Sequence, residues 1–223
     1  MNIFYLDRDP RTAVRMHCDK HVVKMTLETA QMLSTAHRCM NIPPDSPAEE
    51  KEALRANLDA DGILQEAFRH HPMTQWVMET SGNYTWTVAL FRHLCYEYYH
   101  RFGWRYPREH ALYPLVRKFE TLPELMEPGQ QYDPPQCMPV HLQHEDCVTA
   151  YRQYYLECKQ PFAKWTMRPA PEWWTSARKP VIKQYQTPGL PEDCYIELDG
   201  KRISPLLPSL VHAEAWMLEN IPA

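Results

Sequence analysis

Residues 7–38 read DRDPRTAVRMHCDKHVVKMTLETAQMLSTAHR, and this stretch predicts the fold. Its apolar residues recur with the spacing of an amphipathic helix. Asp9 can cap such a helix, with Pro10 in its first position. Only six glycines occur in 223 residues, and several further segments share the helical period. We therefore expect a mostly α fold in which a long helix starts near Asp9 and runs to Arg38.

Polar and ionisable residues form a narrow stripe along this helix. At 100° per residue the side chains of the stripe fall within about 80° of one another, between apolar neighbours. Burying a lysine and a glutamate there costs several kcal/mol unless they pair or face a cleft. We expect a cleft, and the alternative is an ordinary solvated face of a surface helix. The stripe consists of His17, His21, Lys24, Glu28, Gln31 and Thr35.

Length and composition limit the class of protein. A chain of 223 residues, 44% of them hydrophobic, fits a single compact helical domain with a small appendage. No apolar run approaches about 18 residues, and charged residues stand near the amino terminus where a signal peptide needs an apolar core. A cytoplasmic protein without a membrane partner is expected. Seven cysteines with no C-x-x-C pair indicate neither a disulfide framework nor a thiolate zinc site, and no cofactor or metal is expected.

Positive charge gathers toward the carboxyl end, although the net charge is −4. Residues 161–180, PFAKWTMRPAPEWWTSARKP, interleave cations with tryptophans. Cations contact phosphates and exposed rings stack on bases, so this segment predicts a nucleic-acid contact. The alternative is that the tryptophans pin an irregular segment onto the core. The residues expected to bind substrate here are Lys164, Trp165, Arg168, Trp173 and Trp174.

The chain is expected to divide after residue 178. Residues 1–178 would form a helical, catalytic-like domain, and residues 179–223 an appendage with a β-hairpin and a closing helix. The hairpin is predicted in CYIELDGKRIS, residues 194–204, because Asp199-Gly200 is a strong two-residue turn signal. Further helices are expected at 46–70, at 73–102 with a candidate interruption at Ser81-Gly82, at 108–122 and at 144–160, with a loop at 128–139 placed over a cleft.

The stripe carries residue types suited to chemistry on a glycosidic bond. A desolvated Lys24 can form an imine, and Glu28, one turn away, can move protons or stabilise an oxocarbenium-like sugar. His17 and His21 can position or protonate a departing base. Removing a base also requires the nucleotide to leave the stack, which aromatic side chains assist. The four are our predicted catalytic residues, and Gln31 is expected to contact substrate.

The motif order resembles that of a widespread phage-encoded protein family. The motifs are MNIFYLDRDP, HCDKHVVKMTLETAQMLSTAHR, SGNYTW, EYYHRFG, AYRQYY, FAKWT and PEWW, over roughly residues 1 to 175. More distantly, the succession is similar to the pyrimidine dimer DNA glycosylases of the endonuclease V type. This resemblance implies an all-helical enzyme in which a terminal α-amine attacks C1′ and a helix glutamate assists. It places the glutamate at Glu28, a histidine at His17 and phosphate contacts at Arg15 and Lys24, with the nucleophile open between a terminal amine, Lys24 and water.

These features predict a DNA glycosylase that removes a damaged or modified pyrimidine base. It could also have abasic-site lyase activity. A phage-encoded enzyme of this kind would act in the host-cell cytoplasm. Its partner would be DNA or a nucleotide, and its oligomeric state is open. Two alternatives are an N-glycosidic hydrolase or transferase acting on free nucleotides or nucleosides, and a non-catalytic protein that counters host defence. A third is a metal site, since His17 and His21 have i, i+4 spacing. Its further ligands would come from His70, His71, Asp19 or Glu28.

Overall fold

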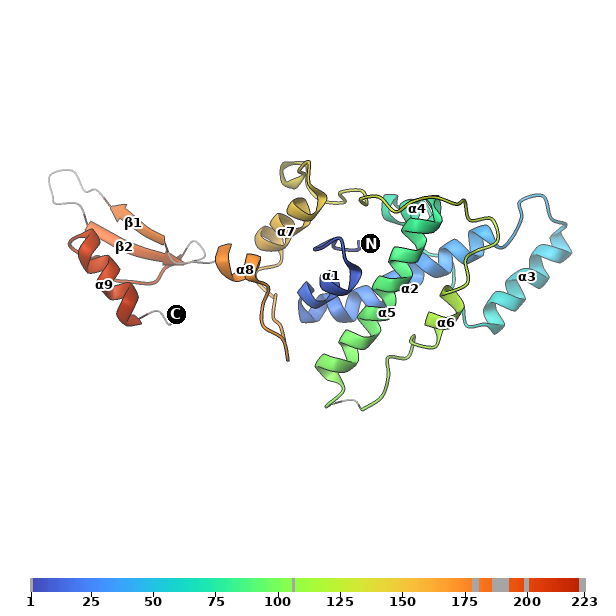
Figure 1. The fold of residues 1–223 in the computed structure, drawn as a ribbon, viewed down its shortest axis with the longest axis horizontal. Coiled ribbons are helices and arrows are strands. Elements are labelled where there is room, and N and C mark those ends of the chain that lie inside the picture. Colours follow the sequence, from blue (N-terminus) through green and yellow to red (C-terminus); the bar gives the residue numbers. More distant parts are fainter. Residues whose placement is uncertain (1, 106, 178–180, 186–192, 199–200, 221–223) are drawn as a thin grey trace. The chain divides into compact units, whose positions relative to one another are not determined.

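The computed structural model describes residues 2–105, 107–177, 181–185, 193–198 and 201–220. The chain forms two compact units, Met1–Ala170 and Pro171–Ala223. Helices make up the regular structure described in the first unit, and the second adds a small sheet (Figure 1). The predicted mostly α fold with a small carboxyl-terminal appendage is confirmed.

The stretch that predicted the fold forms two helices rather than one. α1 (Pro10–Met16) begins as predicted, because the carboxylate of Asp9 accepts a backbone N–H of the first turn at 2.9 Å. α2 (Asp19–Met40) follows after a break, with extended backbone at His17 and Cys18. The prediction of a single helix is therefore wrong at His17 and Cys18. Side chains before the break do not continue the helical face of those after it.

Arg101, a fully buried side chain, stabilises this break. Its guanidinium donates to the carbonyl oxygens of Arg15 at 3.1 Å and His17 at 2.8 Å, and to the carboxylate of Asp19 at 2.9 Å. In a continuous helix the two carbonyl groups would accept N–H groups of the following turn. Arg101 follows His17 by 84 positions, so the partner that ends α1 is remote in sequence.

α2 packs against α5 (Ser81–Phe102) at the centre of the first unit (Figure 1). α4 (Pro72–Glu79) precedes α5, and Thr80 between them is extended, with φ −142° and ψ 152°. The predicted interruption near position 81 is confirmed. Gly82 is required there, because a Cβ would overlap the backbone of residues 130–131.

The other helices of this unit frame the central pair. α7 (Cys147–Cys158) lies within its predicted range, but α3 (Ala48–Ala60) ends ten residues before the predicted end at 70. Gly62 follows it with a φ of 77°, which ends a helix. α6 (Leu115–Phe119) is shorter than predicted because Pro114 stands at its start, where a proline fits but an interior proline would not. A single 3-10 turn spans Val140–Leu142.

The amino-terminal segment runs through the core. Residues 2–6 are all buried and form no strand. They join a core of large, fully buried side chains, each of which stabilises the fold by about 1.5–3 kcal/mol. This path brings the start of the chain beside α2. The core includes Met25, Tyr84, Phe91 and Phe119.

In the part of the second unit that the structure describes, two helices accompany a three-stranded antiparallel sheet. α8 (Glu172–Ala177) comes first. The strands stand in the order β1 (Val181–Tyr185), β2 (Asp193–Leu198) and β3 (Lys201–Arg202). α9 (Leu210–Asn220) packs against β1 and β2.

The predicted hairpin corresponds to β2 and β3. Leu198 pairs with Lys201 in an antiparallel register, while the predicted turn at Asp199-Gly200 lies outside the described residues. The division between the units falls at Ala170, before the boundary expected at residue 178. Within the described residues, no helix has both the length and the apolar character needed to cross a membrane.

Candidate active site

A recess of about 430 Å³ lies beside the amino-terminal half of α2. One wall is α2, and the others come from the amino-terminal segment, the loop before α7, α7 and the segment after it. Three of the four predicted catalytic residues meet in this recess. Its lining residues are Asn2, Phe4, Lys20, His21, Lys24, Glu28, Cys137, Tyr154, Lys159 and Phe162.

Glu28 is the carboxylate of the recess. Its side chain is only 15% exposed, and Oε1 lies 3.3 Å from Nζ of Lys24, one turn earlier. Oε2 accepts the backbone N–H of Asn2 at 3.2 Å. The two oxygens therefore have different partners, which fixes the plane of the carboxylate toward the cavity.

His21 is buried against the amino-terminal segment. Its ring stacks on Phe4 with centroids 4.1 Å apart, and its Nδ1 is hydrogen-bonded to the hydroxyl of Tyr155. Burial raises the pKa of Tyr155 well above its ordinary value, so this hydroxyl keeps its proton. The other acceptor near this hydroxyl, Sγ of Cys18, is 4.0 Å away and is a weak acceptor. We therefore assign Nδ1 as the acceptor and Nε2 as the protonated nitrogen of His21.

The surroundings keep His21 neutral. Burial first, and then the electrostatic influence of His17, Lys159 and Lys24, lower the pKa of His21 to about 2. A neutral imidazole at pH 7 donates or accepts a hydrogen bond, but it offers no imidazolium proton to a leaving group. Of the two roles predicted for His21, protonation of a base does not fit a neutral ring, and positioning of a base stays a prediction.

Aromatic rings hold two of the three lysines of the recess. Nζ of Lys159 lies 4.1 Å from the ring centroid of Tyr154 and 5.4 Å from that of Phe4. Nζ of Lys20 lies 4.7 Å from the ring centroid of Phe162. Cation–π contacts of this kind orient an ammonium group without neutralising it. Three lysines against one carboxylate make the recess attractive to an anionic ligand.

Lys24 differs from the expectation in one respect. Its side chain is 64% exposed, so the desolvation expected of an imine-forming lysine is absent. The amine lies at the mouth of the recess as the ion-pair partner of Glu28. The amine is accessible to solvent, and burial does not prepare it as a nucleophile.

Phe4 connects these groups through an uncommon backbone conformation. Its φ is 54°, in the left-handed region that non-glycine residues seldom adopt. The side-chain oxygen of Asn2 accepts the N–H groups of Ile3 at 2.8 Å and Phe4 at 3.2 Å, which supports this turn. Strained residues held by their surroundings are common at functional sites.

His17 is not part of the recess, and this prediction is wrong. The ring is fully buried, with Nδ1 2.8 Å from the carbonyl oxygen of Ala13 and Nε2 3.1 Å from that of Ile3. Burial lowers the pKa of His17 to about 4. The break at the end of α1 removes His17 from the helical line of α2, so it links α1 to the amino-terminal segment instead.

Two predicted binding residues of the segment after α7 form hydrogen bonds within the first unit. Nε1 of Trp165 donates to the carbonyl oxygen of Met16 at 3.0 Å. Arg168 makes two bonds to Glu97, at 2.5 and 2.8 Å. These contacts favour the alternative that this segment is pinned to the core. Lys164 keeps an exposed side chain, while its carbonyl oxygen accepts the N–H that begins α2.

The remaining predicted binding residues lie elsewhere. Gln31 is half-buried on α2 beyond the recess, and Arg15 is exposed and lines a second pocket. Trp173 and Trp174 belong to the second unit, where their rings are edge-on with centroids 6.1 Å apart. Trp174 is buried, so its ring is packed.

Seven lining residues of the recess were missed. Lys20 had a signal, because it lies next to the stripe in a helical projection. The other six come from segments that tertiary packing brings to α2, and no local pattern marks them. They are Asn2, Phe4, Cys137, Tyr154, Lys159 and Phe162.

No group of three or more His, Cys, Asp or Glu side chains among the described residues is arranged to hold a metal ion. The two histidines of the proposed i, i+4 pair are separated by the helix break, which removes the geometric basis of that alternative. A search of protein families, curated proteins and solved structures finds no match to this chain. Functional inference therefore depends on the site itself.

Proposed function

We propose that the recess cleaves the N-glycosidic bond of a damaged or modified pyrimidine nucleotide in DNA. The observation that carries this proposal is the Glu28 carboxylate, largely shielded from solvent and oriented inside a cationic cavity. Cleavage of the bond builds positive charge on the sugar, which a carboxylate stabilises. It also builds negative charge on the departing base, to which Nε2–H of His21 can donate.

The lining suits a single nucleotide turned out of a strand. Lys20 and Lys159 are placed to contact phosphate oxygens, and the rings of Phe4, Tyr154 and Phe162 supply apolar walls. Enzymes that act on a base in DNA remove it from the stack into such a pocket. A cavity of about 430 Å³ is in the size range of small-molecule sites.

Of the three candidate nucleophiles, the amine of Lys24 and a water can be weighed in the recess, while the terminal amine of Met1 lies outside the described residues. Attack by a water held by Glu28 releases the base and leaves an abasic site. Attack by the neutral amine of Lys24 at C1′ breaks the bond to the base, which leaves with a proton. The C1′–O4′ bond of the sugar then opens, O4′ takes up the second amine proton, and the resulting imine is reduced by borohydride to a stable adduct. The 64% exposure of Lys24 and its ion pair with Glu28 favour water. Borohydride trapping on abasic-site DNA, with Lys24→Met beside the unaltered protein, separates the two.

The test of the proposal is base release from duplex oligonucleotides that each carry one damaged or modified pyrimidine. Glu28→Gln retains an oxygen for the Asn2 N–H but loses the charge, and we expect release to fall by about 10²- to 10⁴-fold. Glu52→Gln, an exposed position of α3, is the matched control and should leave release unchanged. Equal release by Glu28→Gln and the control would contradict the proposal, and so would no release from any substrate.

A free nucleotide or nucleoside is the second candidate substrate. One observation supports this second candidate. Trp165 and Arg168, which were expected to contact a DNA strand, are hydrogen-bonded to other groups of the protein instead. The same chemistry at Glu28 would then act on a mononucleotide. Release of the base from nucleoside monophosphates, at a protein concentration that releases no base from duplex DNA, would assign a free nucleotide as the substrate. A non-catalytic protein would instead keep its biological activity in Glu28→Gln.

A further inference from the structure

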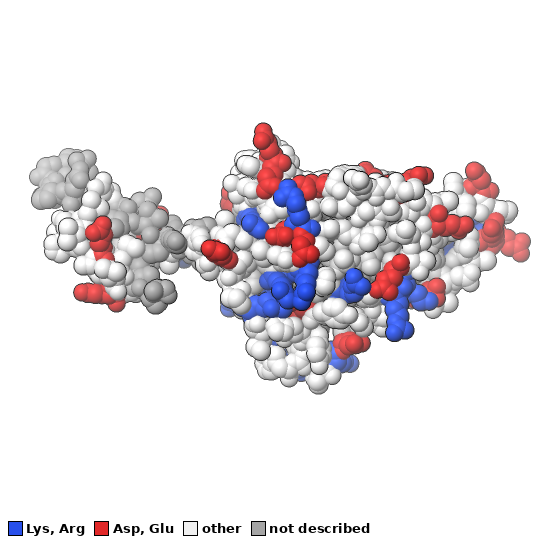
Figure 2. Space-filling view, in the orientation of Figure 1, with Lys and Arg blue, Asp and Glu red and all other residues white. Residues whose placement is uncertain are grey.

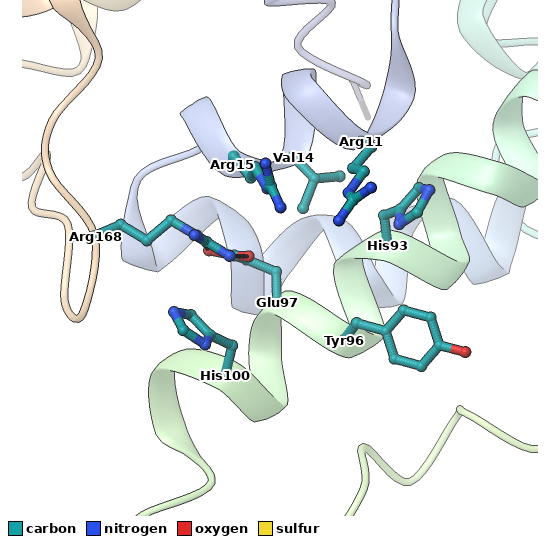
Figure 3. Close-up of a pocket in the computed structure, with 8 residues that line it drawn as sticks. All are labelled: Arg11, Val14, Arg15, His93, Tyr96, Glu97, His100 and Arg168. Atoms are coloured by element: carbon teal, nitrogen blue, oxygen red, sulfur yellow. Dashed lines mark hydrogen bonds and ion pairs between the residues drawn. The ribbon is translucent and has the colours of Figure 1, made fainter.

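A second cavity, of about 310 Å³, lies between α1 and α5 and is separate in its lining from the recess. Arg11 and Arg15 reach it from α1, and Arg168 closes one end. Figure 3 shows the guanidinium groups of Arg11 and Arg15 directed from α1 toward α5. Figure 2 shows Lys and Arg side chains gathered over the part of the first unit where Figure 1 draws α1.

The carboxylate of this cavity is already neutralised. Glu97 accepts two bonds from Arg168, at 2.5 and 2.8 Å, and one from Nε of Arg101 at 2.8 Å. Burial alone would raise the pKa of Glu97, but the bonds from Arg168 and Arg101 hold it below its ordinary value. Two guanidinium groups, those of Arg101 and Arg168, therefore pair with one carboxylate. The negative charge of Glu97 is compensated by them and does not neutralise Arg11 or Arg15.

Arg11 and Arg15 are cations without an ion-pair partner among the described residues. They stand one turn apart on the same face of α1, and both side chains are exposed. Like charges at this spacing destabilise a helix. An anion between them would relieve the repulsion, and two guanidinium forks match the oxygens of a phosphate.

Apart from Glu97, the wall opposite α1 adds no negative charge to the cavity. His100 is hydrogen-bonded through Nε2 to the carbonyl oxygen of Met167 at 3.3 Å. Met167 has a φ of 60°, a left-handed conformation that directs the next residue, Arg168, onto Glu97. Burial first, and then the charges of Arg92 and Arg11, lower the pKa of His93 on the same wall.

We propose that the cavity between α1 and α5 binds a phosphate group through Arg11 and Arg15. This site is independent of the glycosidic chemistry proposed for the recess, because the two cavities share no lining residue. The phosphate can belong to a free phosphate compound or to a nucleic-acid strand, and both present the same oxygens to the two guanidinium groups.

Isothermal titration calorimetry of the full chain with pyrophosphate, and separately with an eight-nucleotide thymidine oligonucleotide, tests this site. We expect the double variant Arg11→Gln/Arg15→Gln to raise the Kd of at least one probe by about tenfold or more. Arg117→Gln removes the same kind of exposed charge from α6 and should change neither Kd. Introduced into a Glu28→Gln background, the same arginine double variant should raise the Kd by the same factor, because distant sites contribute independently, and this separates the proposal from that for the recess.

The two probes distinguish the source of the phosphate. Arginine-dependent binding of pyrophosphate assigns a free phosphate compound, and arginine-dependent binding of the oligonucleotide alone assigns a strand. Binding of neither probe would overturn the proposal. An equal loss of affinity in Arg117→Gln would also overturn it, because the effect would then reflect net charge rather than this cavity.

Discussion

The backbone nitrogen of Asn2 lies 3.2 Å from Oε2 of Glu28, although 26 positions separate the two residues. The side chain of Asn2 holds this arrangement. Its Nδ2 donates to the carbonyl oxygen of Cys137 at 3.0 Å, and its Oδ1 accepts the N–H groups of Ile3 and Phe4. The geometry of the candidate catalytic carboxylate thus depends on an amide that anchors three separate backbone groups.

Replacing Asn2 by alanine removes these bonds without touching a charge. We expect Asn2→Ala to lower the free energy of unfolding by about 1–3 kcal/mol, since buried backbone groups lose their partners. Under the proposed function, base release should fall mainly through kcat, because the carboxylate is misplaced while the lysines that line the recess remain. Urea denaturation and steady-state kinetics measure the two effects. An unchanged kcat in a destabilised Asn2→Ala variant would show that Asn2 has a purely structural role.

The part of the site that could be predicted from the sequence is the part that one helix carries. His21, Lys24 and Glu28 are spaced by three or four residues, so the helical period alone places them on one face. Asp9 with Pro10 gave the start of α1 for the same reason, since capping depends on neighbouring residues. Both features, the shared helix face and the helix cap, depend only on residues within about two helical turns of one another.

What could not be predicted depends on partners far along the chain. The break that removes His17 from the stripe is stabilised by Arg101, and no pattern near His17 signals it. Lys159 and Phe162 reach the recess because α7 returns past the start of α2. The sequence predicted Arg168 as a phosphate contact. The fold shows instead that its guanidinium forms an ion pair with the buried carboxylate of Glu97.

Arg101 is predicted to be essential for stability. It is fully buried and bonded to the carboxylates of Glu97 and Asp19 and to two backbone carbonyl groups. Arg101→Met leaves buried acceptors and charge without their partner, which costs about 3–5 kcal/mol of the free energy of unfolding. Thermal or urea denaturation measures the loss. Arg117→Met, on the exposed face of α6, should change stability by less than about 0.5 kcal/mol. Similar values for the two variants would contradict the role assigned to Arg101.

His37 is predicted to make the fold sensitive to acid. Its Nδ1 accepts from the amide of Asn41 at 2.9 Å, so its Nε2–H donates to the hydroxyl of Tyr84 at 2.7 Å. Burial lowers the pKa of His37 to about 4, whereas the unfolded chain has a value of about 6.5. The unfolded state therefore takes up a proton first as the pH falls, and stability that is complete above pH 6.5 is lost toward pH 4. Between pH 7 and pH 5 this costs about 2 kcal/mol.

Urea denaturation at the two pH values tests this linkage. His37→Gln cannot titrate, so its stability should fall by about 2 kcal/mol less between pH 7 and pH 5 than that of the unaltered protein. Comparing differences in this way cancels the contributions of the other histidines. Identical pH dependence in the two proteins would show that His37 does not keep its low pKa in the folded state.

Met167 offers a test of backbone strain beside the second cavity. Its φ of 60° is costly for a side chain with a Cβ, and its own side chain is 65% exposed, so little packing is lost by shortening it. We expect Met167→Gly to be more stable than Met167→Ala by about 1 kcal/mol, because glycine adopts this conformation freely. At an exposed helical position the order reverses, and Ala53→Gly in α3 should lose about 1 kcal/mol. Chemical denaturation of the three variants measures both differences. A higher stability of Met167→Ala than of Met167→Gly would show that residue 167 is not held in the left-handed region in solution. The backbone conformation that directs Arg168 onto Glu97 would then be absent.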